Sequence, residues 1–203
     1  MPERPSPDLE RMLTDVEWAM SKQFAARDLV PMLENLVRAA PAASEACYFA
    51  KLRLSELIVG DAPFRAARLA RDVLESGDSD RAWAVLGLAH SLLGHFRSAA
   101  RAYRRALALA PDCAVYEHNL GHVLDVALER PQDALAHLER AHRGLPHERE
   151  IASSYAHALL RSGQPERARE LLLLAVEGEA EADQILSAWQ YANGNRIPTK
   201  PAF

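Results

Sequence analysis

The stretch from Trp83 to Pro111, WAVLGLAHSLLGHFRSAARAYRRALALAP, decides how the rest of the chain is interpreted. Its apolar and small residues recur at the spacing of two helices, with Gly94 at the turn between them and Pro111 after the second. The residues that define the unit are Trp83, Leu86, Gly87, Gly94, Phe96, Ala99, Tyr103, Ala106, Leu107 and Pro111. A helix pair of this kind cannot bury its apolar face alone. The stretch therefore predicts an array of stacked copies.

The flanking sequence falls into the same register. The next copy has Leu120 and Gly121 on its first helix, ends at Pro146, and carries one extra residue, which we place at the turn 129–131. A further copy starts near Arg149. The matching positions of that copy are Tyr155, Ala156, Leu159, Gly163, Ala168, Leu172 and Ala175. Upstream, the matching positions are Phe49, Leu52, Gly60, Ala66, Ala70 and Val73, although Arg53 stands where a small residue is expected.

These residues resemble the tetratricopeptide repeat family over most of the chain. The resemblance implies an all-α fold, a right-handed α-solenoid of helix-turn-helix repeats with capping helices at both ends. Small residues such as Gly87 and Gly121 would let the two helices of a repeat cross closely. The expected divisions are an N-terminal helical pair at 1–45, repeats at 46–79, 80–113, 114–148 and 149–182, a capping helix at 183–194 and a flexible tail at 195–203.

Composition supports this fold class and excludes several functions. Ala, Leu and Arg, which favour helices, dominate over the β-branched residues of sheets. The formal net charge of −4 and the pI near 6.1 do not favour binding to nucleic acid or to an anionic membrane. Cys47 and Cys113 form no metal or disulfide pattern, and no long apolar run is present. We therefore expect a cytoplasmic protein without a membrane segment or cofactor.

The family resemblance also implies where a partner would bind. The first helices of such repeats line a concave groove, and contacts fall at fixed repeat positions. The expected partner-binding residues are Ala50, Leu54, Arg81, Ala84, Leu88, His118, Asn119, His122, Asp125, Ser153, His157 and Arg161. The early positions are apolar and the later ones polar, which suits a partner peptide or helix with a few apolar anchors. Ala50 and Leu54 replace the Lys and Asn of the family's carboxylate clamps, which argues against that subtype.

The function expected from these features is a non-catalytic protein-interaction module, acting as an adaptor, scaffold or chaperone. No phosphate-binding loop or catalytic arrangement is present, so we expect neither an enzyme nor a small-molecule substrate. One alternative is a self-associating structural subunit, for instance a homodimer, because basic residues predominate from Ala46 to Pro111 and acidic ones from Asp112 to Ala182.

Two clusters leave further alternatives open. His118 and His122, with Asp125 and His157, have spacings that a transition metal could use, although we expect them to line the groove without a metal. Exposed arginines on two successive second helices form the other cluster, either a solvated face or a surface for an acidic partner or RNA. Its members are Arg68, Arg71, Arg97, Arg101, Arg104 and Arg105.

Overall fold

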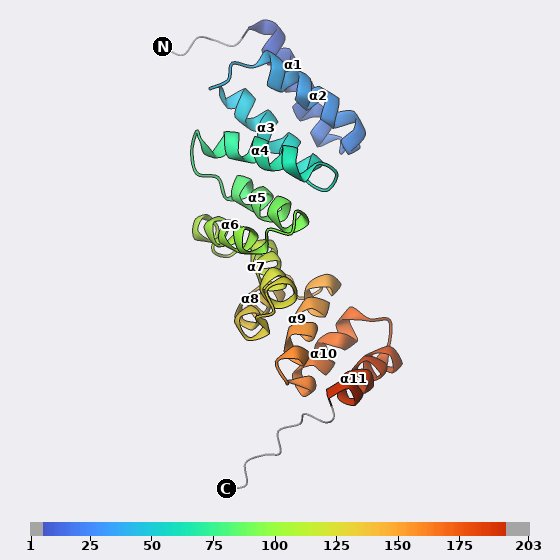
Figure 1. Cartoon of the computed structure of the whole chain (residues 1–203). Coiled ribbons are helices and arrows are strands. Elements are labelled where there is room, and N and C mark those ends of the chain that lie inside the picture. The colour runs from blue at the N-terminus through green and yellow to red at the C-terminus, as the bar shows by residue number, and fades with distance from the viewer. Residues whose placement is uncertain (1–5, 194–203) are drawn as a thin grey trace. The chain divides into compact units, whose positions relative to one another are not determined.

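The computed structural model describes residues 6–193 and is helical in all its regular structure over that range (Figure 1). The first six helices are α1 Pro7–Ser21, α2 Ala26–Ala39, α3 Glu45–Ile58, α4 Pro63–Leu74, α5 Asp80–Leu92 and α6 Phe96–Leu109. The remaining elements are α7 Ala114–His122, the π-helix η1 Val123–Ala127, α8 Pro131–Gly144, α9 Arg149–Arg161, α10 Pro165–Ala175 and α11 Glu179–Asn193. These elements confirm the all-α fold class. The expected tail, 195–203, lies outside the described residues.

The chain forms two compact units. Unit 1 ends at Pro111 and contains α1 to α6, and unit 2 begins at Asp112 and contains α7 to α11. Within each unit, successive helices pack on one another as hairpins, most extensively α5 on α6 and α7 on α8. The boundary between the units lies next to the expected boundary between the second and third repeats, at residues 113 and 114. The sequence pattern did not predict that the array is divided there.

Local sequence signals explain where the helices begin. The side chains of Ser6, Ser44 and Ser79 accept hydrogen bonds from backbone N–H groups in the first turns of α1, α3 and α5. Second helices α4, α8 and α10 begin with proline, whose missing N–H is harmless in a first turn. Gly94 and Gly163 lie between the two helices of their hairpins with φ of +74°, a conformation that glycine adopts without strain.

The close helix crossings predicted for Gly87 and Gly121 are present. A Cβ atom on Gly87 would lie 2.6 Å from the ring of Tyr103 on α6, which is itself buried. A Cβ atom on Gly121 would lie 2.6 Å from Cγ of Leu138 on α8. In both repeats a large side chain of the second helix therefore fills the space that glycine leaves on the first. This packing fixes the position of each first helix on its partner.

The extra residue of the third repeat lies inside a helix and not in the turn 129–131 where the sequence analysis placed it. Residues Val123–Ala127 form a π-helix, in which the Leu128 N–H bonds to the carbonyl oxygen of Val123 at 3.0 Å. A π-turn holds one more residue than an α-turn, so it absorbs an insertion without lengthening the loop. The π-helix also carries Asp125, whose side chain is buried.

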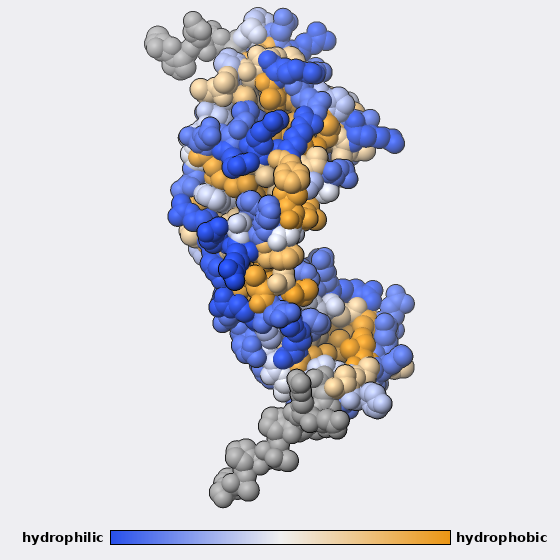
Figure 2. All heavy atoms as spheres, in the orientation of Figure 1, coloured by the Kyte–Doolittle hydropathy of each residue, from blue (hydrophilic) through white to orange (hydrophobic). Residues whose placement is uncertain are grey.

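Both ends of the array are helical. The expected N-terminal pair is α1 and α2, which bury Val16, Leu33 and Leu36 between themselves and α3. The C-terminal capping helix α11 begins at Glu179, before the expected boundary at residue 183. Although α10 and α11 are in contact, Leu173 and Leu174 of α10 remain 39% and 49% exposed. Figure 2 shows apolar side chains at the surface in the part of the molecule where Figure 1 labels α10.

Candidate functional site

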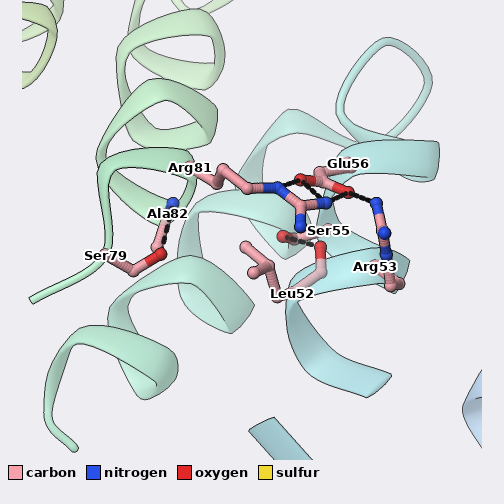
Figure 3. A network of polar contacts seen from close by, with 7 residues as sticks. All are labelled: Leu52, Arg53, Ser55, Glu56, Ser79, Arg81 and Ala82. Atoms are coloured by element: carbon pink, nitrogen blue, oxygen red, sulfur yellow. Dashed lines mark hydrogen bonds and ion pairs between the residues drawn. The ribbon is translucent and has the colours of Figure 1, made fainter. Parts of the chain in front are cut away.

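In unit 1 the exposed edge of the first helices is held together by an ion-pair network (Figure 3). Arg81, in the first turn of α5, donates from Nε and Nη2 to the two carboxylate oxygens of Glu56 on α3, at 2.7 and 2.6 Å. Arg53 donates to the same carboxylate at 3.2 Å, and its guanidinium lies 5.9 Å from the ring centroid of Phe49. The bidentate geometry fixes the spacing of α3 and α5 at this edge.

The remaining expected residues of unit 1 differ in their access to solvent. Leu88 is 37% exposed and Ala84 is half-buried, so both can contact a partner. Ala50 and Leu54 have exposed fractions of 0% and 1% because α3 turns them into the core. This burial corrects the placement on the groove face that was expected for both residues. They support the surface from beneath and offer a partner no contact area.

In unit 2, Asp125 of the π-helix anchors two side chains of α9. Its side chain is 2% exposed, and His157 donates from Nδ1 to Oδ2 at 2.6 Å. Arg161 donates from Nη1 to Oδ1 at 3.0 Å and also to the backbone carbonyl of Asp125. A buried carboxylate needs such partners, since an unpaired charge in this position is strongly destabilising. The three residues, which are 32 and 36 positions apart in sequence, therefore form one structural cluster.

A second side-chain link to α9 comes from α7. His118 of α7 is buried, and its Nε2 is hydrogen-bonded to Oγ of Ser154 on α9 at 3.0 Å. Burial lowers the pKa of His118 below the usual 6.5, with Glu150 opposing this shift and the nearby His122 adding to it. The ring centroid of His122 lies 6.1 Å from that of His118. His118 therefore serves mainly as a neutral link between the two helices.

The first helices of unit 2 thus present a polar surface whose side chains are held in place by the buried residues beneath them. His122, Ser153 and His157 are exposed on it, and Asn119 is half-buried. Because Asp125 holds His157 through Nδ1 and Arg161 through Nη1, the outer nitrogens of both side chains are oriented before any partner arrives. We call this set of α7, π-helix and α9 residues the polar face. Its members are His118, Asn119, His122, Asp125, Ser153, His157 and Arg161.

One polar cluster of unit 2 was missed by the sequence analysis. Glu117 of α7 is 5% exposed, and its carboxylate contacts Arg140 Nε and His137 Nδ1 of α8 at 2.5 Å each. The hydrogen bonds to Glu117 raise the pKa of Arg140. A signal was available, because Glu117 occupies the repeat position at which the preceding copy has Trp83. A charged residue at a core position needs a buried partner.

His118 and His157 of the polar face are held by hydrogen bonds to neighbouring side chains. Over residues 6–193, no group of three or more His, Cys, Asp or Glu side chains is placed to hold a metal ion. His118 Nε2 and His157 Nδ1 are engaged by Ser154 and Asp125. The contacts of these histidines are accordingly those of a hydrogen-bonded surface. Over the same residues, no helix is both long and apolar enough to cross a membrane.

The stacked hairpins and the contacts between their first helices define a helical-repeat protein. Two family models, both for the tetratricopeptide repeat, match residues 80–113 and 125–194, about half of the chain together. The chain therefore belongs to the tetratricopeptide repeat family. No curated protein sequence gives a significant match.

Solved structures of MamA share this fold. A crystal structure of MamA is 18% identical, with 85% of this chain and 96% of that chain covered and a TM-score of 0.65. The structure titled MamA 41-end from Desulfovibrio magneticus RS-1 is 12% identical, with 93% and 98% covered and a TM-score of 0.69. The MamA RS-1 ArsTM double mutant is 13% identical, with 90% and 98% covered and a TM-score of 0.70. At these identities the likeness concerns the fold alone.

Proposed function

We propose that this chain is a non-catalytic interaction module, an adaptor, scaffold or chaperone, that binds a segment of a partner protein on the polar face of unit 2. The observation that carries the proposal is the anchoring of His157 and Arg161 by the buried carboxylate of Asp125. Fixed side chains lose little conformational entropy on binding, which favours recognition. The remaining N–H groups of Arg161 suit the carbonyl oxygens of a peptide backbone or an acidic side chain, and Nε2 of a neutral His157 can accept a hydrogen bond from a backbone N–H.

We also propose a second contact between the partner and unit 1, and this contact is apolar. Leu88 and Ala84 lie on α5, the helix whose first turn carries the Arg81–Glu56 ion pair. An apolar side chain of the partner would pack against them. A cytoplasmic location is part of the proposal, and the free thiols of Cys47 and Cys113 are compatible with a reducing compartment.

The proposal is tested by affinity capture from a lysate of the native host, with partners identified by mass spectrometry. The informative variant is His122→Ala combined with Arg161→Ala, and the matched control is His147→Ala, because His147 is also exposed but lies between α8 and α9. We expect the double variant to lose a partner that wild type and His147→Ala retain. Circular dichroism verifies that all three proteins are folded. If all three capture the same partners, the binding site does not lie on the polar face.

Self-association into a structural subunit is the second candidate, and the exposed Leu173 and Leu174 of α10 favour it. Sedimentation of the purified protein at several concentrations separates the two functions. A subunit of an assembly would gain mass with concentration, and Leu174→Asp would reverse that gain. The interaction module keeps one mass over the same range.

A further inference from the structure

A hollow of about 300 Å³ lies between α5 and α6 of unit 1, and none of its lining residues belongs to the polar face. Trp83, Leu86 and Ala102 contribute apolar side chains to its lining, and His90, Arg101 and Arg105 contribute basic ones. Figure 2 shows apolar and polar side chains next to one another over the part of the molecule where Figure 1 labels these two helices. The combination of an aromatic wall with cationic groups gives the hollow a definite chemical preference.

The positive charges around the hollow are poorly compensated. Among the described residues, Arg101 has a neutral partner, Ser98 Oγ at 3.1 Å, and Arg71 donates to the backbone oxygen of Ala67. Arg105 lies over the ring of Trp83 and pairs with Asp78 at 3.4 Å. Both members of that pair are more than half exposed, so the pair is weak and a competing anion can replace it.

A neighbouring hollow in the same unit gives a direct comparison. The hollow bordered by α2, α3 and α4 is also lined by cationic residues. There, however, Lys51 is paired with Asp72 at 2.9 Å and Arg65 with Glu34 at 2.6 Å. Two of the four cationic side chains in that lining are thus neutralised by acidic residues of the same lining. The hollow between α5 and α6 has no acidic residue in its lining.

The surroundings of His90 show the same excess of positive charge. Its Nδ1 is buried and has no hydrogen-bond partner among the described residues. Burial lowers the pKa of His90, and the positive charges of His95, Arg71 and Arg101 lower it further. An anion placed in the hollow would offset these charges.

We propose that the hollow between α5 and α6 is a docking site for an acidic segment of a partner protein. Carboxylates of that segment pair with Arg101 and Arg105, and an adjacent apolar side chain packs against Trp83 and Leu86. Charge complementarity identifies an acidic occupant, and the apolar wall favours a peptide over an inorganic anion. A single aromatic residue does not make the stacking track of a nucleic-acid surface. This site is separate from the polar face and does not depend on it.

The test uses the full chain and a fluorescein-labelled peptide, Glu-Glu-Leu-Glu-Glu with both ends capped. Fluorescence anisotropy measures its affinity for wild type, for Arg101→Glu/Arg105→Glu and for Arg97→Glu/Arg104→Glu. The two double variants change the net charge equally, but Arg97 and Arg104 do not line the hollow. Circular dichroism verifies that each variant is folded. Two further probes are the same peptide with glutamine for glutamate and a single-stranded uridine oligonucleotide.

We expect the glutamate peptide to bind wild type, and the Arg101/Arg105 variant to weaken it by roughly ten-fold or more. The Arg97/Arg104 variant should weaken it by no more than about three-fold, because neither side chain lines the hollow and an exposed charge that makes no direct pair contributes little. Histidine NMR should show the pKa of His90 rising when the peptide is bound. The proposal is overturned by equal weakening in both variants, by equal affinity for the glutamine peptide, by tighter binding of the oligonucleotide, or by no binding of the glutamate peptide at millimolar concentration.

Discussion

Gly87 shows how much of a repeat depends on one residue. The ring of Tyr103 occupies the space beside it, and Tyr103 is buried with its pKa raised to about 12 by desolvation. The sequence pattern predicted this contact because both residues belong to the family's spacing. In contrast, the partners of Asp125 and Glu117 could not be predicted, since a buried ion pair depends on side-chain positions that periodicity does not encode. Only the departure from the apolar pattern at Glu117 gave a warning.

Replacing Gly87 with alanine should therefore destabilise unit 1. The new Cβ would overlap the Tyr103 ring, and overpacking of this kind costs about 1–3 kcal/mol. Urea unfolding followed by circular dichroism measures the loss. The matched control is Gly77→Ala, because a Cβ at Gly77 meets no atom within 4 Å. Equal stability of the two variants would mean that α5 and α6 can separate without cost at this crossing.

At the scale of the element, the π-helix is the feature that most changes the interpretation of the sequence. The repeat spacing required one extra residue in the third copy, but spacing alone does not distinguish a longer turn from a wider helix. The structure places the insertion in Val123–Ala127, where it carries Asp125 into contact with α9. The boundaries of most helices follow from proline, serine and glycine signals. The π-helix has no comparable sequence signal.

Deleting Val126, which is 48% exposed, should convert this turn to α-helix and separate Asp125 from α9. Double-mutant cycles of Asp125→Asn with Arg161→Met measure the interaction. We expect a coupling of about 1–3 kcal/mol in the native chain and less than about 0.5 kcal/mol in the deletion variant. The Glu56–Arg81 pair of unit 1 is the control, and its coupling should be the same in both backgrounds. A coupling retained after the deletion would show that α9, and not the π-turn, positions Asp125.

For the whole molecule, the sequence predicted the all-α fold class but not the division into two compact units. Repeat patterns describe contacts within a hairpin and between neighbours, and they give each neighbour the same weight. The structure concentrates contacts within α1 to α6 and within α7 to α11. Stability in such a protein need not be uniform along the chain. The two units should respond separately to a local perturbation.

Two matched variants test whether the units respond separately: Leu33→Ala in unit 1 and Leu138→Ala in unit 2. Both side chains are fully buried. Each truncation should cost about 2–5 kcal/mol of unfolding free energy. Hydrogen exchange measured by mass spectrometry should accelerate mainly in α1–α6 for the first variant and mainly in α7–α11 for the second. Acceleration spread evenly over both units would show that they unfold as one cooperative block.

The π-helix also constrains how the gene of this protein can change. An insertion in an exposed loop can be removed later with little effect, because few contacts depend on its length. The extra residue in Val123–Ala127 has become part of the helix that positions Asp125. A deletion that restored the regular repeat length would also remove the bonds to His157 and Arg161. Related sequences should therefore either keep both the extra residue and the set Asp125, His157 and Arg161, or lose both.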